Sequence, residues 1–442
     1  MRNMTTSVNK QSLIAYLYFW VGQAISVLGS TIVQFVLIWW IVVEYKDPLY
    51  LSIAYLLAIG VQVIFMPIAG VFVDRWNRKL ILFVSDFLQA VGAVLLIILF
   101  VIKSSFSPET LYWLVICLLC FRGIMNSFHV PAARAIIPLM VPRSHLDRLN
   151  GLQVLIYGVI NITGTAIGAV LYTLFPLDII IWIDCITFVI AVIPLFFITI
   201  PKIEKKIAVS EVNGVKSFLG EFRDGLHIIK TKKGLISLIL VMALINFIEI
   251  PIIVLGPFFV YITHSGTVQS LALIVAASQL GLLLSGLILL LKNRWNKKVL
   301  IIVIAFYIQI TGYLIQVITP IGFEWSFWFM AIGAFIFGSM LPIVNSLFHT
   351  IIQVLVPPEL QGRVTSIIAG ITGSILPVGM IASGPLADIF GIQELFLAAI
   401  VLGFLVLSFA WFFTDIRLID DYEEMGIYED KVPTDQTMNV SN

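Results

Sequence analysis

The chain alternates between long runs of apolar residues and short polar segments. Twelve apolar runs can be counted, each of about twenty residues or more. A helix rises ~1.5 Å per residue, so about twenty residues cross the ~30 Å hydrocarbon core of a bilayer. Barrel strands would give short alternating segments instead. The expected spans are residues 13–43, 50–73, 80–102, 110–139, 149–175, 178–200, 235–262, 268–291, 299–319, 325–355, 364–387 and 393–414. The pattern predicts an all-α polytopic membrane protein with twelve transmembrane helices.

The composition agrees with this pattern. Hydrophobic residues make up 60% of the chain and charged residues only 12%, which lies outside the range of soluble globular proteins. With an even number of spans, both termini lie on one side. If that side is the cytoplasm, 23 of the 26 Lys and Arg residues fall in cytoplasmic segments, only Lys46 and Lys103 face outward, and Arg122 lies within a span. Because basic residues are enriched in cytoplasmic loops, we expect a cell-membrane protein with both termini inside.

The longest polar connection, residues 201–234, divides the chain into an N-terminal six-helix bundle (1–200) and a C-terminal one (235–414). Within the connection Phe218, Phe222, Leu226 and Ile229 recur every three or four residues. This spacing predicts an amphipathic helix along the inner membrane surface. The acidic segment 415–442 is expected to be a disordered cytoplasmic tail.

The two halves of the chain resemble each other. The letters Arg-Trp-Asn-Arg-Lys that begin at Arg75 return as Arg-Trp-Asn-Lys-Lys at Arg294, and an offset near 215 aligns Gly123 with Gly338. Each half has six spans, so the copies keep the same orientation in the membrane. This is the parallel-repeat plan of many secondary transporters.

The loop between spans 2 and 3 carries a spaced set of small and charged residues, namely Gly70, Asp74, Arg75, Arg78 and Lys79. In this spacing the loop resembles the signature loop of the major facilitator superfamily, with Asn77 where the family has glycine. Asn tolerates left-handed backbone angles better than most residues, so the turn is expected to survive.

Span 4 and its end carry a more particular resemblance. The run from Arg122 and Gly123 through Phe128 and His129 to Pro142 is similar to the macrolide-efflux and enterobactin-exporter branch of the drug:proton antiporters. The antiporter motif of span 5 is incomplete, because Thr165 stands where the family has proline.

The resemblance implies the facilitator fold and transport by alternating access. It also implies that the signature loop gates the inner mouth, with Asp74 pairing with a facing helix end in one state. Anchoring by the positive-inside rule also accounts for Arg75, Arg78 and Lys79, although it leaves Gly70 and Asp74 unexplained.

Charged residues inside the spans are candidates for proton coupling, because each costs at least ~2.5–3.5 kcal/mol at mid-membrane. Glu249 lies deep in span 7, and a carboxyl group in a low-dielectric site binds a proton more readily than in water. Asp86 lies near the inner end of span 3, and Arg122 lies in span 4. A structural hydrogen bond or ion pair is the alternative for each of the three.

Polar side chains recur in every third span. In the resembling family, spans 1, 4, 7 and 10 line the central cavity. The cavity-lining substrate candidates are Gln23, Ser26, Ser30, Gln34, Asn126, Asn246, Asn345 and His349.

These observations indicate a secondary transporter that exports amphipathic, drug-like or macrolide-like small molecules in exchange for protons. No phosphate-binding loop sequence is present, so an ion gradient is the expected energy source. We expect no enzymatic activity, catalytic residues, metal or cofactor, no nucleic-acid partner, and a monomer in the lipid bilayer. Export of a siderophore or another metabolite is the first alternative, followed by import and by a channel.

Overall fold

The computed structural model describes residues 10–198, 223, 226–292 and 295–420. Every regular element in this part of the chain is a helix, and twelve helical segments are long and apolar enough to cross a membrane. The predicted all-α, twelve-span architecture is confirmed. The largest boundary differences are at the starts of two spans: the helix of span 5 covers Arg143–Leu174 rather than 149–175, and that of span 11 covers Pro358–Phe390 rather than 364–387.

The N-terminal bundle contains spans 1 to 6. Its elements are α1 (Lys10–Tyr45), α2 (Pro48–Tyr55), the π-helical turn η1 (Leu56–Gly60), α3 (Val61–Arg75), α4 (Arg78–Val101), the short 3₁₀ turn η2 (Lys103–Ser105), α5 (Pro108–Met140), α6 (Arg143–Leu174) and α7 (Leu177–Phe197). Span 2 is therefore a helix with a π-helical turn in its middle. Such turns are rare and occur frequently at functional sites.

The C-terminal bundle contains spans 7 to 12. Its elements are α9 (Leu235–Phe258), the π-helical turn η3 (Phe259–Thr263), α10 (Val268–Leu291), α11 (Lys298–Ile318), α12 (Ser326–Leu355), α13 (Pro358–Phe390), α14 (Ile392–Phe413) and the 3₁₀ turn η4 (Asp415–Arg417).

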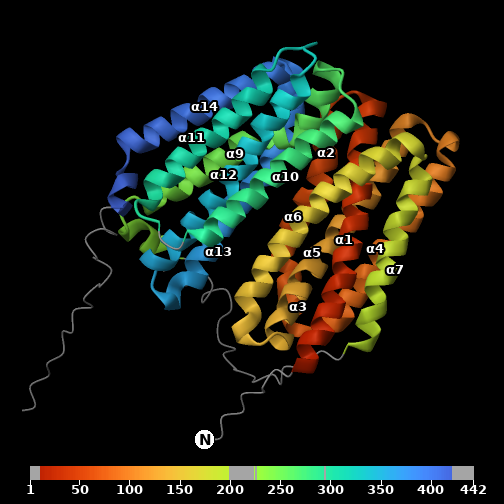
Figure 1. Cartoon of the computed structure of the whole chain (residues 1–442), viewed down its shortest axis with the longest axis horizontal. Helices are drawn as coiled ribbons and strands as arrows, with labels where there is room; N and C mark the ends of the chain where they lie inside the picture. Colours follow the sequence, from red (N-terminus) through yellow and green to blue (C-terminus); the bar gives the residue numbers. More distant parts are fainter. Residues whose placement is uncertain (1–9, 199–222, 224–225, 293–294, 421–442) are drawn as a thin grey trace, which may run out of the picture.

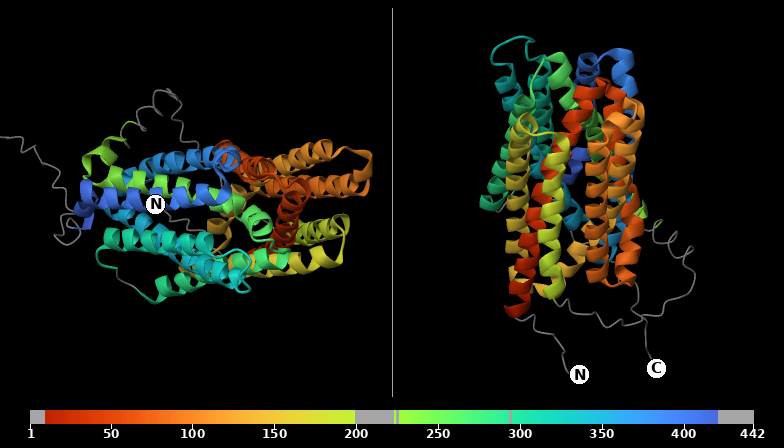
Figure 2. Two further views of the ribbon diagram at one scale, coloured as in Figure 1. Left: turned by 90° about the horizontal axis from the view of Figure 1, so that it is seen from above. Right: turned by 90° about the vertical axis from the view of Figure 1, so that its right-hand side faces the viewer.

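The two bundles lie side by side and are closer at one end than at the other. In Figure 1 they lean together at the top and spread apart toward the bottom, the side where α1 begins and α14 ends, and Figure 2 shows the same two bundles from above and from one side. At the close end the rings of Trp39 and Tyr261 contact edge to face, with centroids 5.4 Å apart. Gly384 of α13 also packs against Leu49 and Ser52 of α2. The bundles are therefore in contact on the side away from the helix termini at Lys10 and Phe413.

The internal repeat is visible in helix packing. A Cβ atom added to Gly123 of α5 would lie 2.6 Å from the carbonyl oxygen of Ala58, and one added to Gly338 of α12 would clash with the carbonyl oxygen of Ser278. At the offset of the repeated loop, which is 219, Ala58 in span 2 aligns with Ala277, the neighbour of Ser278 in span 8. Small residues of this kind let helix backbones approach closely in membranes, so the aligned glycines have the same packing role.

The signature loop keeps its turn by a different means from the one expected. Asn77 has φ −70° and ψ 111°, and its side chain accepts a hydrogen bond from the backbone N–H of Lys79 at the start of α4. The expectation of a left-handed angle at this position is wrong. Asn77 acts instead as a helix N-cap, which satisfies a backbone donor that has no partner within the helix.

Two predictions concerned the segments outside the bundles. In the connection 201–234, residues 226–231 are helical and Ile229 is buried in the protein core, whereas Phe218 and Phe222 lie outside the described residues. The predicted disorder of 415–442 is wrong for its first turns. Asp420 accepts hydrogen bonds from the backbone N–H groups of Val299 and Leu300 at 2.9 and 3.0 Å, so it caps the N-terminus of α11.

Candidate functional site

A cavity of about 250 Å³ lies inside the N-terminal bundle. Spans 1 to 4 and span 6 line it, and the π-helical turn η1 contributes Ala58 and Ile59. Five of the predicted cavity residues lie in its lining: Gln23, Ser26, Ser30, Gln34 and Asn126. The spacing of three or four residues in α1 therefore places a polar face toward the cavity, as a helix of 3.6 residues per turn requires.

Asp86 of α4 lies in the cavity wall and is 1% exposed. Its Oδ2 accepts a hydrogen bond from Nε2 of Gln23 at 3.0 Å, and its Oδ1 lies 3.1 Å from Nε2 of His129 on α5. Helices α1, α4 and α5 thus meet at one carboxylate. A proton on the imidazole would make the contact with His129 an ion pair, so the charge of this group can change with protonation.

Arg122 forms an ion pair with Asp184 of α7. Asp184 is fully buried, and it also accepts a hydrogen bond from the hydroxyl of Ser30 at 2.8 Å. The Arg122 side chain is 12% exposed and reaches the cavity wall. This ion pair neutralises the arginine, which leaves Asp86 and His129 as the other acidic and basic side chains among the cavity-lining residues.

The prediction from sequence missed Asp184 and gave no role to His129. Asp184 lies within the apolar run 178–200, seven residues after the start of α7. The energetic cost that identified Glu249 applies to Asp184 equally, so the sequence contained the observation needed to find it. His129 lay within the motif of span 4, but its partner was not visible without the fold.

The profile of the Major Facilitator Superfamily matches residues 19–377, which is well over half of the chain. The chain belongs to the major facilitator superfamily. It is therefore a multi-pass membrane transporter and not an enzyme.

Curated relatives of this superfamily protein include drug exporters. Macrolide efflux protein A of Streptococcus pyogenes is 30% identical over 402 residues, which cover 91% of this chain and 96% of that protein. Multidrug efflux pump Tap of Mycolicibacterium fortuitum is 24% identical over 382 residues, which cover 84% and 88%.

Solved structures confirm the facilitator fold. A bacterial homologue of the iron transporter ferroportin in its inward-facing state superposes with a TM-score of 0.71 at 15% identity, over 90% of this chain and 98% of that one. The outward-facing state of a bacterial homologue of ferroportin gives 0.58 at 16% identity, over 90% and 99%.

The facilitator signature loop lies outside the cavity lining. Arg78 donates a hydrogen bond to the carbonyl of Ala135 near the end of α5 at 2.9 Å, and Lys79 donates to the carbonyl of Ile198 just after α7 at 2.7 Å. Cations at the carboxyl ends of helices are favourable. Gly70 has open space around its Cα and Arg75 is exposed, while the side chain of Asp74 lies outside the described part of the protein. The loop therefore links the start of α4 to the ends of α5 and α7.

The candidates from the C-terminal half of the transporter do not join the cavity. Asn246, Asn345, His349 and Glu249 are absent from its lining. Asn246 donates a hydrogen bond to the carbonyl of Met242 one turn earlier, and Asn345 and His349 are exposed on α12. The contribution of spans 7 and 10 to substrate binding therefore stays a prediction.

Within the described residues, no group of three or more His, Cys, Asp or Glu side chains is arranged to hold a metal ion. Two of the acidic and basic side chains of the cavity lining, Asp86 and His129, lie beside each other, and Arg122 pairs with Asp184 behind the lining.

Proposed function

We propose that this superfamily member exports amphipathic small molecules of the drug or macrolide class in exchange for protons, by alternating access. The observation that carries the proposal is the buried Asp86 in the cavity wall, held by Gln23 and close to His129. The similarity to macrolide and multidrug efflux proteins supports the substrate class.

In the proposed cycle, the contacts that Asp86 makes with Gln23 and His129 change. A proton entering the cavity is taken up between Asp86 and His129, and a substrate leaves as this group changes its charge. The ion pair of Arg122 with Asp184 keeps the rest of the wall electrically balanced, so that the energy of binding depends on one titrating group. The apolar lining, including Leu37, Ile38 and Phe188, binds the apolar part of the substrate.

The arrangement of the bundles suits the substrate-loading state of such an exporter. With both termini in the cytoplasm, the spread ends of the bundles face inward and the contact between Trp39 and Tyr261 closes the outer side. Opening outward then requires that contact to break while the inner ends come together. The signature loop lies at the inner ends and serves as the gate.

Uptake of a labelled macrolide into everted membrane vesicles tests the proposal. An acid-inside gradient should drive uptake, and an ionophore that collapses the gradient should abolish it. Asp86→Asn should lose gradient-driven uptake while reaching the membrane at normal levels. The matched control is Asp388→Asn, an exposed carboxylate near the end of α13, which should transport normally. The proposal would be overturned if uptake did not depend on the proton gradient, or if Asp86→Asn took up the macrolide at the normal rate.

A further inference from the structure

Three polar side chains in the cavity wall have no partner among the described residues. Ser26 of α1, Gln89 of α4 and Asn126 of α5 line the cavity, and none of their side chains forms a hydrogen bond within the described part of the protein. Ser26 is 4% exposed and Gln89 is 8% exposed. Burying a hydroxyl or amide group to this degree costs free energy unless another hydrogen bond replaces the one to water. Water or a bound molecule is therefore needed to pair with them.

Contacts between α4 and α5 fix the level of the two amides in the bundle. The helices are consecutive spans and run antiparallel, and Asp86 of α4 contacts His129 of α5 at 3.1 Å. About two turns further along α4, a Cβ atom added to Gly92 would lie 3.1 Å from Cγ of Arg122 on α5. Each amide lies about midway between these two contacts along its own helix. The two amides therefore share one level of the cavity wall.

Ser26 occupies the same level on α1. One turn before it, Nε2 of Gln23 donates a hydrogen bond to Asp86 at 3.0 Å. About one turn after it, the hydroxyl of Ser30 donates to Asp184 of the ion pair at 2.8 Å. A layer of neutral side chains thus lies between two layers in which the charged groups are already paired. We refer to Ser26, Gln89 and Asn126 as the neutral layer.

The neutral layer can both donate and accept hydrogen bonds. A serine hydroxyl does both, and each amide has an oxygen that accepts and an NH₂ group that donates. An ammonium group only donates, so it would leave the amide N–H groups unpaired. A carboxylate only accepts, and it would also lie close to the negative charge of Asp86. Hydroxyl groups on neighbouring carbon atoms, as in a sugar, pair with both kinds of group.

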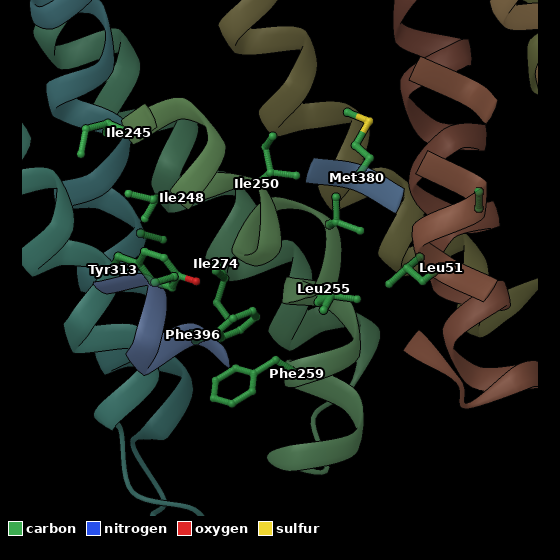
Figure 3. Packing of buried hydrophobic residues seen from close by; sticks show 14 of the residues in the cluster. Leu51, Ile245, Ile248, Ile250, Leu255, Phe259, Ile274, Tyr313, Met380 and Phe396 are labelled. Atoms are coloured by element: carbon green, nitrogen blue, oxygen red, sulfur yellow. The ribbon is translucent and has the colours of Figure 1, made fainter. Parts of the chain in front are cut away.

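The fold does not require polar side chains at these places. At the offset of the repeated loop, 219, Ser26 aligns with Ile245 and Gln89 aligns with Ile308. Figure 3 shows Ile245 among the buried apolar side chains of the C-terminal bundle, and Ile308 is 39% exposed. Both halves form the same kind of helix, with isoleucine in one half and a polar residue in the other. The polarity of the neutral layer therefore points to binding rather than to helix packing.

We infer that the neutral layer binds an uncharged, hydroxyl-rich group of the transported molecule, such as a sugar. This inference rests on the proposed function and specifies which part of the substrate enters the layer. Leu37 and Ile38 line the cavity about two turns beyond Ser30 on α1, so the apolar part of the same molecule has a separate surface. Glycosylated amphiphiles are the substrate class that fits both surfaces.

Equilibrium binding to the purified protein in lipid nanodiscs tests this inference. The probes are a tritiated macrolide with a basic and a neutral sugar, and the derivative that lacks the neutral sugar. The wild type should bind the complete compound about tenfold more tightly, because the derivative loses hydrogen bonds to the layer. Gln89→Met and Asn126→Leu should each weaken binding of the complete compound by a similar factor and leave binding of the derivative unchanged. The control Gln269→Met, at an exposed position on α10, should bind both compounds as the wild type does.

Equal affinities of the wild type for the two compounds would overturn the inference. Variants that weaken the binding of both compounds alike would also overturn it. The comparison on the wild type still decides the question if a variant does not fold. Binding is measured without a gradient, so a protein whose export proves independent of protons should still prefer the complete compound. Normal gradient-driven export with equal affinities would contradict this inference alone.

A second pair of probes covers the case in which the wild type binds neither compound. That result would overturn the macrolide class in the proposed function. A labelled steroid glycoside and its aglycone then replace the two macrolides. A preference for the glycoside that is lost in Gln89→Met supports the neutral layer as a sugar site, and equal binding or no binding overturns it.

Discussion

Arg122 on α5 and Asp184 on α7 form an ion pair, although 61 positions separate them in the sequence. The pair lies at the wall of the cavity and joins two helices of the N-terminal bundle. Ser30 of α1 adds a third helix through its hydrogen bond to Asp184.

Breaking this pair should destabilise the protein strongly. Asp184→Asn leaves the arginine without its partner, and removal of one member of a buried pair costs ~3–5 kcal/mol. We expect the lower end of that range, because Arg122 is partly exposed to the cavity. Thermal unfolding in detergent measures the effect. The double variant Arg122→Gln with Asp184→Asn should recover most of the loss, and strictly additive losses would contradict the pairing.

Lys79 should stabilise the end of the N-terminal bundle that carries the signature loop, through its contact with the end of α7. Lys79→Met keeps most of the apolar stem and removes the donor to the carbonyls of Phe196 and Ile198. We expect a loss of about 1 kcal/mol in the free energy of unfolding. Arg75→Gln is the control, because Arg75 is exposed. Equal losses in both variants would show that the net charge of the loop, and not this contact, is what matters.

The orientation in the membrane can be tested with single cysteines. Starting from a variant in which Cys117, Cys120 and Cys185 are replaced by serine, cysteines at the exposed Ser105 and Ser265 should react with an impermeant thiol reagent in intact cells. This expectation follows from the distribution of Lys and Arg. A cysteine at the exposed Thr231 should react only after the cells are opened. Labelling of Thr231→Cys in sealed cells would reverse the orientation.

His264, in the short connection between η3 and α10, should make stability depend on pH. Burial lowers the pKa of His264 below its usual value, and its ring packs against Phe259 with centroids 4.9 Å apart. Below about pH 6.5 the unfolded chain therefore binds more protons than the folded protein, and the stability falls as the pH decreases. His264→Phe should unfold at more similar temperatures at about pH 7.5 and about pH 5 than the wild type does.

The matched control for this prediction is His227→Phe, because His227 is exposed. It should keep the wild-type pH dependence. If His264→Phe loses as much stability on acidification as the wild type, another group is responsible for the effect.

The sequence by itself determined the membrane architecture. Twelve apolar runs, the uneven distribution of Lys and Arg, and the repeated Arg-Trp-Asn loop can each be recognised from residues close together in the sequence. In lipid a long apolar segment forms a helix, because its backbone N–H and C=O groups must hydrogen-bond within the segment. The polar stripe from Gln23 to Gln34 followed from helical periodicity alone. The family motif of the loop after span 2 could likewise be recognised from the sequence alone.

Only the tertiary structure decided which polar groups meet. Hydropathy places a charge at a depth in the membrane, but the rotation and neighbours of each helix determine its partner. Asp86 and Glu249 are both acidic residues within apolar runs, yet one contacts Gln23 and His129 and the other has no salt-bridge partner among the described residues. Asp420 shows the same limit, because an acidic residue in a polar tail becomes a helix cap only where the chain brings it to the start of α11.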